Sequence, residues 1–174
     1  MKVLVSAFKP FNNNVNNYSM EVLNYIEQVD KIIVDVVYDN CYKQLSTSAD
    51  LNQYDLIIAL GEARMRSELT LEVKAYNLAN CSLKDNANIL RKDSVIIEGL
   101  DGEIDSKVNI ELVKDIVAFS TNPGRFVCNN LYFHLLANYP NKSLFIHIPE
   151  CNNDVDNYKK YAKQINEIIS KMEG

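Results

Sequence analysis

Residues 54–60 read YDLIIAL, and residues 144–148 read LFIHI. Both runs are short, continuously apolar and flanked by polar residues, which is typical of strands covered on both faces. The runs at 2–7 (KVLVSA) and 31–37 (KIIVDVV) are rich in β-branched residues and predict two further strands. Residues 69–78 (LTLEVKAYNL) alternate apolar and polar side chains with a period of two, which predicts a strand with one buried face.

Helical patterns lie between these strands. Apolar residues recur at helical spacing in 19–29, 108–116, 126–139 and 154–172. Asn17 or Ser19 is available to cap the first helix. The third is apolar around most of its circumference and is expected to be buried. Strands that alternate with helices predict an α/β fold, with a mostly parallel sheet and helices on both faces. Residues 12–17 and 80–93 read as loops.

The length of 174 residues, 47% of them hydrophobic, suits one compact domain that spans residues 1–174. The net charge of -5 argues against a nucleic-acid partner, which favours a basic surface. No run of about 18 apolar residues is present, so we expect no membrane span. The first residues lack the pattern of a signal peptide. We therefore expect a cytoplasmic protein.

The four cysteines, Cys41, Cys81, Cys128 and Cys151, are far apart in the sequence. Zinc sites use close-set ligand pairs and disulfide scaffolds are cysteine-dense, so neither a metal site nor a disulfide framework is expected. Each cysteine is then a core residue, a bystander or a nucleophile. Cys128 follows the turn-rich segment 120–125, near the start of the predicted buried helix, where the helix dipole favours a thiolate. The alternative role is a small core residue.

His147 and Glu72 are further candidates. His147 lies near the end of the run at 144–148, and the C-terminal ends of parallel strands are where open α/β sheets place their sites. Histidine can accept a thiol proton near neutral pH, but a core histidine bonded to a backbone carbonyl fits the pattern as well. Glu72 could orient a histidine, or could simply face solvent opposite Lys74.

Four segments together resemble pyroglutamyl peptidase I, also called pyrrolidone-carboxylate peptidase, a cysteine peptidase family. They are SAFKPF (6–11), GEARMRSELTLEVKAYN (61–77), STNPGRFVCNNLYF (120–133) and FIHIP (145–149). The resemblance implies a three-layer α/β/α sandwich around a mixed, mainly parallel sheet. It also implies removal of an N-terminal pyroglutamyl residue from a peptide through a thiol acyl-enzyme, with no metal or organic cofactor. A homo-oligomer, dimer or tetramer, is implied as well.

The resemblance also implies roles for individual residues. Cys128 matches the nucleophile, His147 the base and Glu72 the third member of the catalytic group. Arg66 matches an arginine that would support the oxyanion. The residues that match the substrate pocket are Phe8, Phe11, Glu62 and Val127.

The chain departs from the family pattern at several of these positions. Arg64 and Met65 replace a glycine pair, Glu62 replaces a glutamine, and Asn12 and Asn13 replace two further glycines. If the charge of Glu62 hinders the substrate, then Glu62→Gln should improve turnover. The departures leave two alternatives: a binding or regulatory module on the family fold, and a thiol amidohydrolase with a different acyl substrate. A cysteine that alkylates far faster than the others would favour an enzyme.

Overall fold

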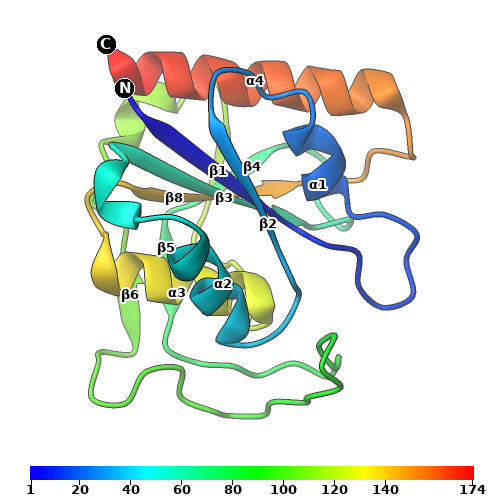
Figure 1. Cartoon of the computed structure of the whole chain (residues 1–174), viewed down its shortest axis with the longest axis vertical. Coiled ribbons are helices and arrows are strands. Elements are labelled where there is room, and N and C mark those ends of the chain that lie inside the picture. The colour runs from blue at the N-terminus through cyan, green and yellow to red at the C-terminus, as the bar shows by residue number, and fades with distance from the viewer.

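A computed structural model describes residues 1–174 as one main sheet with helices on both faces (Figure 1). The strands are β1 (Val3–Phe8), β2 (Asp30–Val34), β3 (Leu56–Glu62), β4 (Thr70–Glu72), β5 (Lys74–Tyr76), β6 (Glu103–Asp105), β7 (Ala118–Ser120) and β8 (Ser143–Ile148). The α-helices are α1 (Tyr18–Leu23), α2 (Asn40–Ser48), α3 (Val127–Asn138) and α4 (Val155–Glu173). Two short 3₁₀ helices cover Leu51–Gln53 and Ile110–Val113.

The main sheet has six strands in the order β2-β1-β3-β8-β4-β7. Its neighbouring strands run parallel except for β8 and β4, which pair antiparallel. Strands β5 and β6 form a separate antiparallel pair. The expectation of a mixed, mainly parallel sheet is therefore confirmed. The antiparallel pair of the main sheet, β8 with β4, positions two of the candidate site residues, as described below.

The sheet is covered on both faces because its central strands carry apolar side chains on both sides. In β3, Ile58 and Leu60 pack in one core cluster with α1 and α4, whereas Ile57 and Ala59 pack in a second cluster with α2 and α3. In Figure 1, α4 lies along one side of the sheet, and α3 and α2 lie on the other. These are the three layers that the sequence predicts.

Caps fix where two helices begin. The Asn17 side chain caps α1 by accepting a hydrogen bond from the Ser19 backbone N–H at 3.0 Å, so Asn17 is the cap. Asp154 caps α4 in the same way, accepting from the Asp156 N–H at 2.9 Å. Helix α1 ends at Leu23, earlier than the pattern at 19–29 predicts, and the chain turns through Gln28 (φ 58°) into β2.

Two predicted elements differ from the structure. The strand expected over 69–78 breaks at Val73 into β4 and β5, which belong to different sheets. The helix expected over 108–116 is only a 3₁₀ turn over Ile110–Val113. Helix α2 was not predicted, because only Cys41 and Leu45 of this helix are buried and the apolar stripe is too sparse to recognise.

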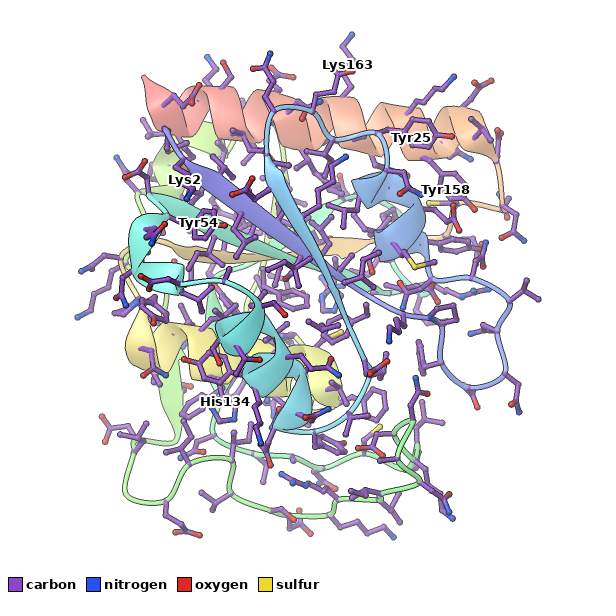
Figure 2. All side chains as sticks on the ribbon, in the orientation of Figure 1. Lys2, Tyr25, Tyr54, His134, Tyr158 and Lys163 are labelled. Atoms are coloured by element: carbon purple, nitrogen blue, oxygen red, sulfur yellow. The ribbon has the colours of Figure 1, made fainter.

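Side-chain contacts join neighbouring elements across the fold (Figure 2). Lys2 Nζ, just before β1, lies 4.7 Å from the centroid of the Tyr54 ring before β3. His134 on α3 stacks on Tyr42 of α2 with ring centroids 4.9 Å apart, and its Nε2 lies 3.1 Å from Asp39 Oδ1. The two contacts of His134 hold α2 against α3, the helix that carries Cys128.

Candidate active site

Cys128 is the second residue of α3, where the predicted helix begins. Its sulfur lies directly over Gly61 of β3. A Cβ atom at position 61 would stand 2.8 Å from Cys128 Sγ and 2.8 Å from the nearest atom of the Phe145 ring. Glycine is therefore required at position 61, because any side chain would occupy the space of the sulfur.

His147 and Glu72 meet because of the antiparallel pairing of β8 and β4. Glu72 pairs with Phe145, two residues before His147, so both side chains project from the same face of the sheet. His147 Nδ1 lies 2.7 Å from Glu72 Oε1, and both side chains are buried. A solvent-facing Glu72 opposite Lys74 is thus wrong: the carboxylate is 0% exposed.

Arg66 contacts Glu72. Its Nη2 donates to Glu72 Oε1 at 2.5 Å, the oxygen that His147 also contacts, and to Asn122 O at 2.9 Å. A weaker bond from the same nitrogen reaches Ser120 Oγ at 3.2 Å. The arginine compensates the charge of a buried carboxylate and connects it to the loop that precedes Cys128. Arg66 does not line the cavity at Cys128, so the structure places it behind the candidate base.

The Cys128 thiol is partly exposed but densely surrounded by protein atoms. This burial raises the pKa of the Cys128 thiol to about 12, and the negative charges of Glu72 and Glu62 add to the shift. The sequence pattern favoured a thiolate at the helix N-terminus. Burial raises the pKa more than the backbone N–H of Cys128 lowers it, so the protonated thiol is favoured. A reaction at Cys128 therefore needs a base to take the proton at the moment of attack.

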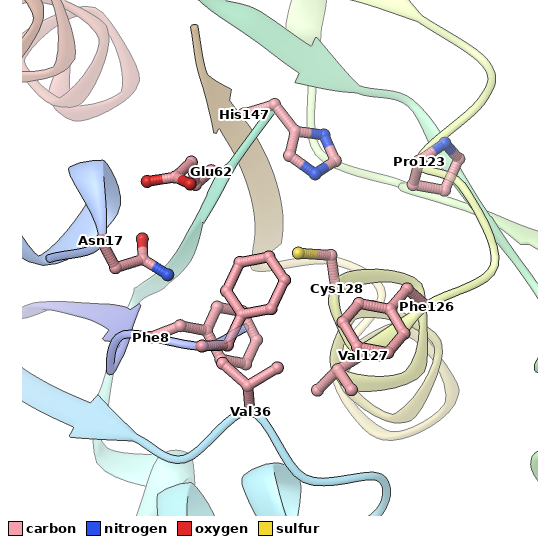
Figure 3. A pocket seen from close by; sticks show the side chains of 10 residues that line it. Phe8, Asn17, Val36, Glu62, Pro123, Phe126, Val127, Cys128 and His147 are labelled. Carbon is pink, nitrogen blue, oxygen red and sulfur yellow. The ribbon is translucent and has the colours of Figure 1, made fainter. Parts of the chain in front are cut away.

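A cavity of about 150 Å³ opens at Cys128 and His147 (Figure 3). Most of its lining is apolar, and the polar groups are few. Its residues are Phe8, Phe11, Asn17, Val36, Glu62, Pro123, Phe126, Val127, Cys128 and His147. All four residues that the resemblance places in the substrate pocket are in this set. Such a cavity fits a small, flat and largely apolar group.

Glu62 contributes a buried carboxylate to the cavity. Its Oε2 accepts a hydrogen bond from the Tyr18 backbone N–H at 2.7 Å, and its Oε1 pairs with Arg64 Nε at 2.7 Å. The Arg64 guanidinium also lies over the Tyr18 ring, 4.4 Å from its centroid. The Tyr18 hydroxyl in turn donates to Glu150. The charge of Glu62 is therefore compensated by Arg64, one of the residues that replace the glycine pair.

The lost glycines do not strain the backbone. Arg64 and Met65 have ordinary negative φ values, and Met65 points into solvent with 99% of its surface exposed. Asn12 and Asn13 do adopt left-handed conformations, with φ of 53° and 60°. Asparagine tolerates this region better than most residues, so the turn survives the replacement of glycine.

Several residues around the site were not found from the sequence. Asn17, Val36, Pro123 and Phe126 line the cavity, and Gly61 lies under the sulfur. Three of them lie beside a recognised sequence pattern: Gly61 follows the YDLIIAL run directly, Pro123 lies in the turn-rich segment 120–125, and Phe126 follows that segment. Asn17 and Val36 carry no such signal, because they reach the cavity only through tertiary packing. No group of three or more His, Cys, Asp or Glu side chains is placed to hold a metal ion. None of the helices has the length and apolar character that a bilayer crossing requires.

A cysteine at a helix N-terminus, near a histidine that a buried carboxylate orients, is the arrangement of cysteine hydrolases. The fold and the site together therefore place the chain in the class of α/β cysteine hydrolases. The chain belongs to the pyroglutamyl peptidase family, because the sequence profile of that family matches residues 1–163.

Individual relatives agree with this assignment. The chain is 31% identical over 179 aligned residues to the pyrrolidone-carboxylate peptidase of Thermosipho africanus, covering 91% of this chain and 86% of that relative. It is 30% identical to the pyrrolidone-carboxylate peptidase of Enterococcus faecalis, covering 86% and 78%. The crystal structure of Bacillus amyloliquefaciens pyroglutamyl peptidase I superposes with a TM-score of 0.85 at 24% identity, covering 98% and 96%. The fold is therefore shared nearly end to end.

Proposed function

We propose that this cysteine peptidase removes N-terminal pyroglutamyl residues from peptides, with Cys128 as nucleophile, His147 as base and Glu72 as the group that orients His147. The observation that carries the proposal is that Cys128 opens into an apolar cavity beside the His147–Glu72 pair, with Nδ1 to Oε1 at 2.7 Å. Membership of the pyroglutamyl peptidase family supports the same activity.

The hydrogen bonding of His147 determines which of its ring nitrogens can take part in the reaction. Because Nδ1 of His147 is bonded to Glu72, Nε2 is the ring nitrogen that remains to accept the proton of Cys128. The sulfur attacks the acyl carbonyl of pyroglutamate and forms a C–S bond. The C–N bond then breaks, and the proton on His147 passes to the leaving amine. A water molecule attacks the thioester, releases pyroglutamate and returns the proton to the thiol.

Hydrogen-bond donors near the sulfur would stabilise the oxyanion that forms on the attacked carbonyl. The backbone N–H of Cys128 lies in the first turn of α3, where helix N–H groups have no partner within the helix. The sequence resemblance assigned this role to Arg66. Its bonds to Glu72 and Asn122 favour a positioning role instead, in which Arg66 holds the carboxylate that orients the base.

The cavity fits the lactam ring of pyroglutamate. The rings of Phe11 and Phe126 lie 5.9 Å apart between centroids and offer apolar surface to the ring carbons. Glu62 offers carboxylate oxygens that can accept the lactam N–H, in the position where the family pattern has a glutamine. Because Arg64 compensates its charge, Glu62 is a recognition group and not an obstacle. This proposal predicts the opposite of the conditional expectation from the sequence, namely that Glu62→Gln lowers turnover.

Further properties belong to this proposal. We expect one domain over residues 1–174 and a cytoplasmic protein without a nucleic-acid partner, in line with the net charge of -5. We also expect a homo-oligomer, dimer or tetramer. Support comes from large apolar side chains that are exposed on the segment after β5: Leu83, Ile89, Leu90, Val95 and Leu100. Light scattering on the purified protein measures the oligomeric state directly.

The activity is tested by release of a fluorogenic amine from a pyroglutamyl amide. The wild-type protein is compared with Cys128→Ser and with a substrate that carries a non-cyclic glutamyl group. We expect release that requires both Cys128 and the lactam. Cys41→Ser serves as the control variant, because Cys41 is buried away from the cavity lining. Folded wild-type protein without activity, or full activity in Cys128→Ser, contradicts the proposal.

A further inference from the structure

Arg125 is the only one of the four arginines that has no carboxylate partner. The other three form ion pairs: Arg64 with Glu62 at 2.7 Å, Arg66 with Glu72 at 2.5 Å and Arg91 with Asp39 at 2.6 Å. Arg125 is partly exposed and lies three residues before Cys128, in the loop that gives Pro123 and Phe126 to the cavity. An unpaired guanidinium at this place can take an anionic group from outside the chain.

The guanidinium of Arg125 is held in one orientation. Its central carbon lies 3.6 Å from the centroid of the Tyr76 ring, so the two planes are in contact. Its Nη1 donates to Asn122 Oδ1 at 3.0 Å and to Gly124 O at 2.7 Å. Nε and Nη2 donate to no protein group. Two N–H-bearing nitrogens of the fork therefore remain for a ligand.

Tyr76 is fixed to the catalytic segment on both sides of Arg125. Its hydroxyl donates to Thr121 O at 2.9 Å, and its backbone N–H donates to Asn129 Oδ1 at 2.8 Å. Asn129 Nδ2 returns a bond to Tyr76 O at 2.9 Å. Asn129 follows Cys128 directly. The stacked Arg125 and Tyr76 therefore form a platform whose position relative to the nucleophile is set by the fold, which is the condition for a specific contact.

The loop with Arg125 borders the cavity through its neighbours Pro123 and Phe126. In Figure 3, Glu62 and Asn17 lie on one side of Cys128, and Pro123 lies on the other. The pyroglutamyl ring occupies the side with Glu62 in the proposed function. The scissile nitrogen and the residue that follows it then extend toward the Pro123 side. In a pyroglutamyl amino acid, the free carboxylate is only two bonds beyond this nitrogen.

We propose that the platform of Arg125 and Tyr76 binds the free carboxylate of the residue after pyroglutamate, so that the enzyme favours pyroglutamyl amino acids over longer or amidated peptides. This inference rests on the proposed function. A carboxylate bound by Nε and Nη2 gains charge-assisted hydrogen bonds at a partly exposed site. The contact exists before and during the reaction, so it lowers KM and leaves kcat nearly unchanged.

The test compares pyroglutamyl-alanine with pyroglutamyl-alaninamide, which differ only in the terminal charge. We expect wild-type kcat/KM to be about tenfold higher for the acid than for the amide. In Arg125→Gln the ratio should fall to about one through a higher KM for the acid, with the amide unaffected. Arg125→Lys keeps the charge but loses the fork and the stacking, and should keep only part of the preference.

Arg91→Gln is the matched control, because Arg91 also lies over a tyrosine ring, at 4.8 Å from that of Tyr38, but outside the catalytic loop. It should keep the wild-type ratio. A wild-type ratio near one, a ratio that survives Arg125→Gln, or an equal loss on both substrates would overturn the inference. In each of these cases the amide is still cleaved by the wild type, so the proposed function stands. Cleavage of neither substrate by the wild type would refute the proposed function and the inference with it.

Discussion

Replacing Gly61 with alanine places a methyl group against the sulfur of Cys128 and the ring of Phe145. The new Cβ would lie 2.8 Å from Cys128 Sγ, 2.8 Å from Phe145 Cζ and 2.9 Å from Phe145 Cε1. Non-bonded heavy atoms are comfortable at roughly 3.5–4.0 Å, so the shortfall is about 1 Å on two sides at once. Neither neighbour can yield easily, since Phe145 is fully buried and Cys128 is fixed in α3.

The effects on stability and on activity follow from this shortfall. Overpacking a core site by one methyl group costs about 1–3 kcal/mol of unfolding free energy. A displacement of about 1 Å at the reacting atom lowers kcat/KM by about 100-fold. We therefore expect Gly61→Ala to fold, to unfold at lower urea concentration, and to lose far more activity than its stability loss explains.

The assays are urea unfolding followed by circular dichroism and the release of a fluorogenic amine from a pyroglutamyl amide. Gly102→Ala is the matched control, because a Cβ at position 102 meets nothing within 4 Å. Its unfolding free energy should stay within about 0.5 kcal/mol of the wild type. Wild-type kcat/KM in Gly61→Ala would refute the reasoning, because it would mean that the sulfur does not react from its position over this glycine.

Three further predictions concern the charges around the site. Arg66→Met removes the ion pair of the buried Glu72 and should lower the unfolding free energy by about 2–3 kcal/mol, with kcat reduced more than KM and partial recovery in Arg66→Lys. Glu62→Gln should lower kcat/KM for the pyroglutamyl amide by about tenfold. Combining it with Arg64→Gly should restore part of the loss, because no unpaired arginine then remains beside the cavity. A higher kcat/KM in the single variant contradicts this prediction. Because the pKa of Cys128 is raised to about 12, alkylation by iodoacetamide in the absence of substrate should keep rising with pH above 9, and a plateau near pH 7 would show that the resting thiol is already ionised.

The elements that the sequence predicted well are those whose burial depends on their own residues. The apolar runs at 54–60 and 144–148 became β3 and β8, and the fully apolar pattern at 126–139 became α3. These runs are apolar on every side, so their burial does not depend on which elements pack against them. Cys128 and His147 could therefore be placed at the start of a helix and near the end of a strand from the sequence alone.

Features that depend on distant partners could not be predicted in the same way. The regular alternation over 69–78 gives no sign of the break at Val73, which arises because β4 joins the main sheet and β5 pairs with β6. The burial of Glu72 depends on Arg66 and on His147, 75 residues away, and not on its neighbours in the chain. The resemblance to the family supplied the roles of these residues, whereas the compensation of Glu62 by Arg64 required the structure.

The placement of Cys128 over Gly61 has a consequence for the life of the chain before it is fully folded. His147 and Glu72 come together when β8 pairs with β4, whereas the Cys128 sulfur reaches its crowded position over Gly61 and Phe145 only when α3 docks on the sheet. Until then the thiol titrates near pH 8.5, as in an unfolded peptide, and is open to peroxide and to mixed disulfides. Docking of the helix raises the pKa of the thiol and so lowers the fraction of thiolate, the form that peroxide attacks. A newly made chain is thus most vulnerable to oxidative damage in the interval before this helix reaches the sheet.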